Sequence, residues 1–327
     1  MLTATHRAAA LLVTCLFGLH APAQAQDAAA NFPNKAVRFI VSFAPGGGTD
    51  LLGRIAADHL SKALGQPFVV ENRPGAGGMI AARAVLAERP DGHTILVGGS
   101  TPMVFNPLVY SDLGYDRADL VAVTILGTYP MVIAGQHNVA KDMKELIESA
   151  KKKGGHMTYG HPGAAAWRAM MEAFNNALGI KMTHVPYKSA GQALPDVIAG
   201  NVQAMLTGIP ATLPHLKSGR VRVLGIASPQ RLTDLPDIPT VAEGGFPGFE
   251  SSVAWSLFSP AGTPPPIINR IQADVARALT LPDVRERFAT AGLTPIGSTP
   301  AQLAARLKED QNKWPRVIRE AGIKVEP

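Results

Sequence analysis

The chain contains one cysteine, Cys15, among its 327 residues. Cys15 lies in an apolar N-terminal segment, so cleavage of that segment would leave a protein without disulfides, thiolate metal ligands or a cysteine nucleophile. Aromatic residues make up only 6% of the chain, and the basic residues are scattered apart from Lys151–Lys153. The basic, aromatic-interleaved stripe typical of nucleic-acid binding is therefore lacking, and we expect no nucleic-acid partner.

Long hydrophobic runs are also lacking. One apolar run, residues 8–19, follows Arg7 and precedes the sequence Ala23-Gln24-Ala25. It is shorter than the roughly 20 apolar residues that a transmembrane helix requires. A positive start, a short apolar core and an A-x-A site are typical of a secretory signal peptide. We predict a signal peptide over residues 1–25, cleaved near Ala25, and a periplasmic mature protein. Lipidation at Cys15 is the alternative, although Thr14 is a poor residue before a lipidated cysteine.

Catalytic and nucleotide motifs are missing as well. The chain has no H-E-x-x-H, no G-x-S-x-G and no close histidine pair, and its glycine-rich turns match neither G-x-G-x-x-G nor a P-loop. The formal S-x-x-K match from Ser149 to Lys152 ends a charged helix, where we expect solvated side chains. We therefore predict no enzymatic activity, no metal site and no cofactor.

Hydrophobic patterns typical of strands and of helices alternate along the chain. The ~300 residues after the signal peptide exceed what one hydrophobic core usually organises, so we expect two lobes. The patterns predict strands at 36–43, 67–71, 94–97, 131–134, 157–160, 182–186, 202–206, 221–227 and 253–258, and helices at 51–64, 79–88, 143–152, 167–178, 190–199, 266–279 and 300–321. Such alternation predicts parallel sheets covered by helices, with any ligand crevice at the carboxyl ends of the strands.

A glycine-rich turn joins the first predicted strand to the first predicted helix. Its candidate ligand-binding residues are Ala44, Pro45, Gly46, Gly47, Gly48, Thr49 and Asp50. Consecutive glycines let a ligand approach the backbone closely, and the unpaired N–H groups of a helix start favour an anion. Two alternatives remain open: Thr49 or Asp50 caps the helix, or the turn has no ligand.

Two further loops follow strands and could meet the same crevice. Ser100 and Thr101 come after the third strand and could orient a ligand through their hydroxyl groups. In the second half, His161, Pro162, Gly163, Ala164, Ala165 and Ala166 occupy the position that corresponds to the glycine-rich turn. Two such turns facing each other would form a cleft. Ordinary turns, with His161 solvated and Trp167 packed in the core, are the alternative.

Four ordered stretches carry a resemblance to a known family. They are the segments 43–50 (FAPGGGTD), 70–78 (VENRPGAGG), 185–188 (VPYK) and 238–249 (IPTVAEGGFPGF), followed by Trp255 and SPAGTP at 259–264. In this order the chain resembles the substrate-binding proteins of tripartite tricarboxylate transporters, also called Bug or TctC-like proteins, over nearly all of its length.

The resemblance implies an α/β, two-lobed periplasmic binding protein of the Venus-flytrap, type II-like class, each lobe a mainly parallel sheet flanked by helices. We expect residues 32–131 with 255–327 in lobe 1 and residues 132–254 in lobe 2, with strands that cross between the lobes near 131 and 254. The resemblance also implies a monomer that closes on a small carboxylate and delivers it to the membrane subunits of a transporter, without chemistry.

The chain departs from the family pattern at positions that bear on the ligand. The 161–167 loop lacks the usual hydroxyl groups, and Gln203 and Thr207 stand where relatives commonly carry aspartates. An acidic partner for a ligand amine is thus missing, so we predict a carboxylate without an amino group, dicarboxylic or aromatic, with Thr207 in the site. Two other functions stay open: a periplasmic enzyme with His161 as general base, and a ligand-sensing accessory protein of a membrane sensor kinase.

Overall fold

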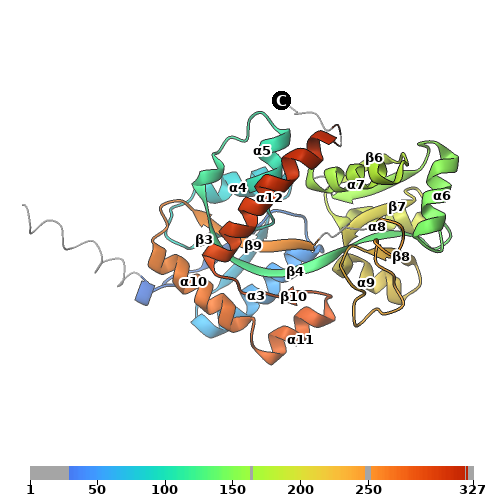
Figure 1. The fold of residues 1–327 in the computed structure, drawn as a ribbon. Coiled ribbons are helices and arrows are strands. Elements are labelled where there is room, and N and C mark those ends of the chain that lie inside the picture. The colour runs from blue at the N-terminus through green and yellow to red at the C-terminus, as the bar shows by residue number, and fades with distance from the viewer. Residues whose placement is uncertain (1–28, 163–164, 247–251, 321, 323–327) are drawn as a thin grey trace, which may run out of the picture.

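The computed structural model describes residues 29–162, 165–246, 252–320 and 322. The predicted signal peptide lies outside these residues. The described part of the chain is an α/β protein with two lobes, in which a mixed sheet is flanked by helices (Figure 1). The α/β, two-lobed fold class predicted from the sequence is thus confirmed.

The first lobe is built on three parallel strands. Its elements are β1 (Val37–Val41), α3 (Gly48–Leu64), β2 (Phe68–Asn72), α4 (Met79–Leu86) and β3 (Thr94–Gly98). β1 lies between β2 and β3 and is parallel to both. Every residue of β3 is buried, as expected for a parallel strand covered on both faces. α3 buries Leu52, Ile55 and Leu60 at helical spacing and ends at Gly65, which adopts the left-handed conformation.

One long strand, β4 (Leu120–Gln136), belongs to both lobes. From Leu120 to Pro130 it pairs antiparallel with β9 (Ser252–Pro260). From Met131 onward it pairs antiparallel with β7 (Ala204–Gly208) on one side, and from Val132 onward with β8 (Val221–Ile226) on the other. The sheet order is β2-β1-β3-β9-β4-β7-β5-β6. β4 therefore changes partners between Pro130 and Met131.

The second lobe repeats the alternation of strand and helix. Its further elements are α6 (Met143–Lys153), β5 (Thr158–Pro162), α7 (Ala165–Leu178), β6 (Thr183–Tyr187), α8 (Ala190–Ala199) and α9 (Ile209–Lys217). β5 is parallel to β6 and to β7, so the lobe combines parallel strands with the antiparallel strand β4.

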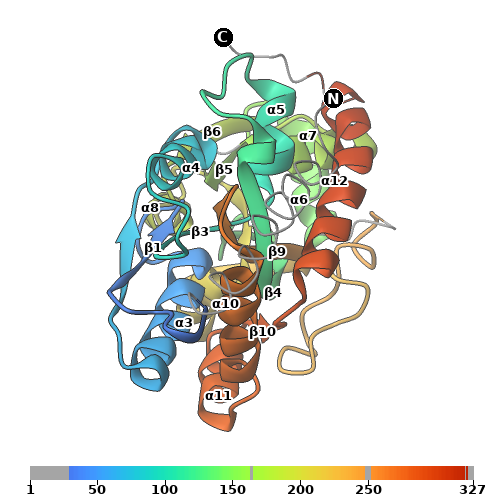
Figure 2. The same cartoon turned by 90° about the vertical axis from the view of Figure 1, so that its left-hand side faces the viewer.

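The chain returns to the first lobe through β9, and three helices and a short strand follow: α10 (Pro265–Ala278), α11 (Pro282–Thr290), β10 (Thr294–Pro295) and α12 (Pro300–Glu320). Figures 1 and 2 both place α12 along β4, with one end near α7. The rings of Phe105 and Trp314 are 4.7 Å apart, and Asn176 Nδ2 of α7 donates to the carbonyl oxygen of Glu320 at 3.2 Å. The last helix thus connects the two lobes.

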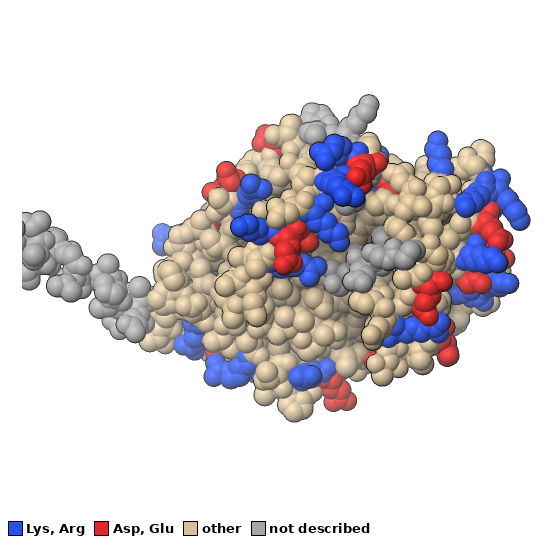
Figure 3. Space-filling model, viewed as in Figure 1, with Lys and Arg blue, Asp and Glu red and all other residues tan. Residues whose placement is uncertain are grey.

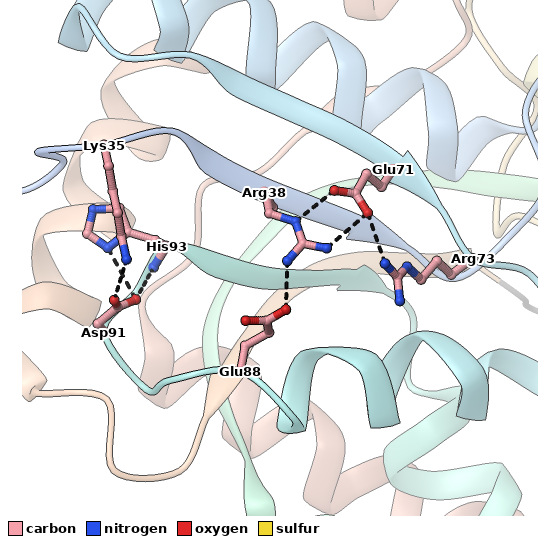
Figure 4. A network of polar contacts seen from close by, with 7 residues as sticks. All are labelled: Lys35, Arg38, Glu71, Arg73, Glu88, Asp91 and His93. Atoms are coloured by element: carbon pink, nitrogen blue, oxygen red, sulfur yellow. Dashed lines mark hydrogen bonds and ion pairs between the residues drawn. The ribbon is translucent and has the colours of Figure 1, made fainter.

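A network of ion pairs fixes the outer edge of the first lobe (Figure 4). Arg38 on β1 donates to Glu71 on β2 at 2.7 Å and to Glu88 at 2.7 Å, and Arg73 pairs with Glu71. Hydrogen bonds from Arg38 hold the pKa of Glu71 below its usual value. These partly exposed pairs join β1, β2 and the end of α4. On the face in Figure 3, basic side chains are interspersed with acidic ones.

Candidate functional site

A cavity opens where both lobes meet strands β4 and β9. Its free volume is about 360 Å³, which includes the open space at its mouth. The first lobe contributes Phe43, Gly47, Gly48 and Thr49, the two strands contribute Tyr129 and Trp255, and the second lobe contributes Trp167, Ser189, Ala190, Thr207, Gly208 and Ala211.

The glycine-rich turn of the first lobe is held in shape by Asp50. Its carboxylate accepts hydrogen bonds from the Gly46 N–H at 3.2 Å, Arg54 Nε at 3.0 Å and Asn72 Nδ2 at 2.9 Å. Asn72 Nδ2 also donates to the carbonyl oxygen of Phe43. Burial raises the pKa of Asp50, but these hydrogen bonds outweigh it and the net pKa is below its usual value. Asp50 therefore shapes the turn from within the lobe.

The helix that follows this turn begins without a side-chain cap. The N-cap of α3 is Gly47, so neither Thr49 nor Asp50 has the capping role considered from the sequence. Gly46 has φ +86°, a conformation that favours glycine. The first N–H groups of α3 consequently have no side-chain acceptor at the N-cap and lie beside the cavity.

Two helices of the second lobe start at the same cavity. Ser189 is the N-cap of α8 and Gly208 is the N-cap of α9, and neither helix has a side-chain cap. Thr207, immediately before α9, is 1% exposed, and its hydroxyl has no hydrogen-bond partner among the described residues. The starts of three helices and a buried hydroxyl therefore converge on one small space.

Aromatic rings form much of the cavity wall. The ring of Trp255 lies 5.4 Å from that of Phe43, edge to face, and 5.8 Å from that of Tyr129. Burial raises the pKa of Tyr129, and the neighbouring Trp255 and Thr49 offset part of the rise, so the phenol is neutral and can donate. The buried Trp255 Nε1 makes no hydrogen bond of normal geometry within the described part of the chain.

The chemistry of this wall suits an anion with an apolar body. None of the described residues that line the cavity carries a formal charge. Helix N-termini stabilise anions through their free N–H groups and dipoles. Thr49, Tyr129 and Thr207 add hydroxyl groups, and the aromatic rings offer contact to carbon atoms. An ammonium group would find no carboxylate in this lining.

A second, wider opening adjoins the first and shares Phe43 with it. Its free volume is about 880 Å³ including open space, and it lies between the 74–78 turn of the first lobe and Pro186, Tyr187 and Lys188 of the second. Tyr187 donates to Asp196 at 2.7 Å, and burial together with Asp196 raises the pKa of Tyr187 to about 12. Lys188 is the one cation among the described residues that line this opening.

The structure brings only some of the predicted site residues together. Gly47, Gly48, Thr49 and Thr207 line the cavity, whereas Ala44, Pro45 and Gly46 lie in the turn beside it and Asp50 lies in the first turn of α3. Ser100 and Thr101 start an irregular helix, Thr101–Phe105, where the Ser100 carbonyl oxygen accepts from Met103 and Val104. Ser100 and Thr101 line neither of the two openings.

The predicted loop of the second lobe is only partly described. His161 lies on β5, is 3% exposed, and its ring is 5.9 Å from that of Tyr159 and 5.7 Å from that of His184. Pro162 ends β5, Ala165 and Ala166 begin α7, and Gly163 and Ala164 lie outside the described residues. His161 is thus packed in the second lobe and is not a solvated turn residue.

Sequence reasoning did not assign eight residues of this lining to the site: Phe43, Tyr129, Trp167, Ser189, Ala190, Gly208, Ala211 and Trp255. A serine before a helix, as at position 189, is a recognisable signal. Tyr129 and Trp255 come from crossing strands and have no local signal, because only the tertiary fold brings them to the cavity.

The described residues include neither a membrane-spanning helix nor a metal-binding cluster. No helix there is both long and apolar enough to cross a membrane. That part of the chain also contains no group of three or more His, Cys, Asp or Glu side chains arranged to hold a metal ion.

Comparison with known proteins gives a consistent result. The family model described as "Tripartite tricarboxylate transporter family receptor" matches residues 52–323. Protein BugT of Bordetella pertussis is 34% identical over 312 residues, covering 94% of each chain.

Solved structures agree with the family match. The structure of R. palustris Rpa4515 with adipate superposes with a TM-score of 0.87 at 31% identity, covering 90% of this chain and all of that one. MatC from Rhodopseudomonas palustris with bound malate superposes with a TM-score of 0.81 at 33% identity, covering 88% of this chain and all of that one. The periplasmic binding protein fold expected from the sequence is confirmed.

Proposed function

The chain belongs to the tripartite tricarboxylate transporter receptor family, and we propose that it is a periplasmic solute-binding protein for a small carboxylate without an amino group. The observation that carries this proposal is the convergence of the starts of α3, α8 and α9 with the buried Thr207 hydroxyl on one uncharged cavity. Relatives solved with adipate and malate support the same ligand class.

The proposal includes how the molecule works. We assign residues 32–131 and 255–327 to lobe 1 and residues 132–254 to lobe 2, because β4 changes partners at Pro130–Met131. The lobes close on the acid as a monomer, without chemistry, and the membrane subunits of the transporter receive it. Cleavage near Ala25 releases the protein into the periplasm.

A matched panel of acids tests the ligand class. The protein is unfolded and refolded to remove any co-purified ligand and is then titrated calorimetrically with succinate, aspartate, glutarate, glutamate, malate, adipate and benzoate. Succinate and aspartate differ only by the amino group, as do glutarate and glutamate. We expect at least one acid without an amino group to bind. Where it has an amino counterpart in the panel, it should bind at least tenfold more tightly than that counterpart, because the described lining offers no carboxylate to an ammonium group.

Two outcomes would contradict the proposal: tighter binding of aspartate than of succinate, or no binding of any acid. Mass spectrometry of the bound acid after prolonged incubation separates binding from catalysis, since an enzyme with His161 as base would convert the acid. Uptake of the same labelled acid by cells with and without the gene tests delivery to the transporter and distinguishes transport from a sensing role.

A further inference from the structure

The ring of Tyr129 lies between the first residues of one helix from each lobe. A Cβ atom at position 48 would lie 2.5 Å from Tyr129 Cε1, and a Cβ atom at position 208 would lie 2.1 Å from Tyr129 Cε2. Real Cβ atoms essentially never come within 3.0 Å of another group. The ring can therefore occupy this place only because both neighbours are glycine.

The backbone itself does not require glycine at either position. Gly208 has φ −77° and ψ 146°, which any residue adopts, and Gly48 begins a regular α-helix with no positive φ. Gly48 lies in the first turn of α3, where glycine has a lower helix propensity than alanine, whereas Gly208 is the N-cap of α9, where glycine is one of several accepted residues. Close approach of the Tyr129 ring is thus the feature that accounts for both glycines.

Tyr129 is also held firmly in place. It sits on β4 paired with Val253, directly before the point where the strand changes partners, and is 4% exposed. Its ring contacts the ring of Trp255, and its hydroxyl faces Thr49. The ring lines the cavity between the helix starts, so it takes up volume in the space where a bound acid would lie.

We propose that Tyr129 is a specificity-determining residue that restricts the cavity to short, compact acids, an inference that rests on the proposed function. The ring acts as a fixed wall, and Gly48 and Gly208 are the two positions that admit it. A long diacid, whose two carboxylates lie far apart, must extend into the volume that the Tyr129 ring occupies. A short diacid fits beside the ring.

Variants of Tyr129 with a shorter side chain test the inference directly. Affinities of Y129A and Y129V for succinate, adipate and suberate are compared with those of the unchanged protein by calorimetry. We expect the preference for succinate over suberate to fall at least tenfold in both variants, because an apolar cavity left by a removed side chain accepts a guest of similar size. Valine suits a strand and keeps the test usable if Y129A does not fold.

Y129F is the matched control, because it keeps the ring and removes only the hydroxyl. We expect Y129F to weaken all three acids by a similar factor and to leave the preference for succinate unchanged within twofold. A loss of preference in Y129F equal to that in Y129V would overturn the role of the ring.

Gly208 provides an independent test. G208A places a methyl group against the ring, so we expect succinate to bind at least tenfold more weakly. In G208A/Y129V the ring is gone, and the effect of G208A should fall below threefold, as measured by a double-mutant cycle. An equal effect of G208A in both backgrounds would overturn the inference.

The two proposals fail in distinguishable ways. If the unchanged protein binds none of the acids, the proposed function fails together with this inference. If it binds them and Y129V keeps the full preference for succinate, only the assignment of Tyr129 is wrong.

Discussion

Asp50 shows how a polar residue next to a cavity can act entirely within its own lobe. Its carboxylate receives hydrogen bonds from the Gly46 N–H, Arg54 and Asn72, and its side chain is 8% exposed. Asp50 is absent from the cavity lining. Its effect on a ligand is therefore indirect, through the shape of the turn that precedes α3.

Replacing Asp50 with asparagine tests this role. Hydrogen bonds to a charged group contribute more than neutral ones, so D50N should lower the free energy of unfolding by about 2 kcal/mol at pH 7. The pKa of Asp50 is lower in the folded protein than its unfolded value of 3.8. The stability that the Asp50 carboxylate contributes is therefore fully present at pH values well above 3.8 and is lost as the pH falls through the folded pKa. The difference between the two proteins in urea unfolding should therefore begin to shrink below about pH 4 and close as the pH falls through the folded pKa.

D58N is the matched control. Asp58 on the same helix also pairs with two cations, Lys62 and Arg287, but its side chain is 40% exposed. Exposed pairs contribute about 1 kcal/mol or less, so D58N should have a smaller effect at pH 7. Equal effects of D50N and D58N would show that the network around Asp50 has no special role.

At the scale of elements, three helices begin at the cavity without a side-chain cap. The N-cap of α3 and that of α9 are glycines, which cost a helix only a few tenths of a kcal/mol relative to a capping side chain. No side chain at the N-cap competes for the first N–H groups of these helices, so an anion in the cavity could accept from them.

Adding a carboxylate at the start of α9 should mimic the bound anion. T207D places a negative charge beside the helix starts, so we expect it to weaken succinate more than tenfold through like-charge repulsion. T207N is similar in size and uncharged, and should weaken succinate severalfold at most. Calorimetry of both variants checks the result. Undiminished affinity in T207D would mean that the acid does not lie near α9.

Most elements could be predicted from periodicity alone, and the exceptions have physical reasons. α9 was not predicted because Pro210 and Pro214 are typical helix breakers, although a proline is accepted in the first turn. The first part of β4 was not predicted because Gly127 and Pro130 resemble strand ends. In the fold Gly127 pairs with Trp255 and has Thr294 nearby, where a Cβ atom would not fit.

Only four of the twelve residues that line the candidate site were predicted from the sequence, for a related reason. Glycine-rich turns between strand and helix form a local pattern, so Gly47, Gly48 and Thr49 could be found. Tyr129 and Trp255 come from strands that cross between the lobes and are 126 positions apart in the chain, so no local pattern marks them. Their role follows only from the pairing of β4 with β9.

At the scale of the whole molecule, an acid in this cavity would contact both lobes and both crossing strands. A ligand that binds only the folded state at 100 times its Kd stabilises it by about 2.7 kcal/mol. We expect succinate at that concentration to raise the thermal midpoint of the entire molecule by roughly 4–5 °C. Scanning calorimetry measures this, with aspartate as the control. A shift confined to one of two separate transitions would contradict a site shared by the lobes.

The position of β9 has a consequence for folding. β9 lies between β3 and β4 in the sheet, yet it follows β4 in the chain by more than a hundred residues, after the whole second lobe. The first lobe cannot complete its sheet until that last quarter of the chain is available, and such non-local pairings form slowly. For a protein exported to the periplasm, as proposed, the strand order means that a chain still lacking its last quarter cannot finish folding its first lobe.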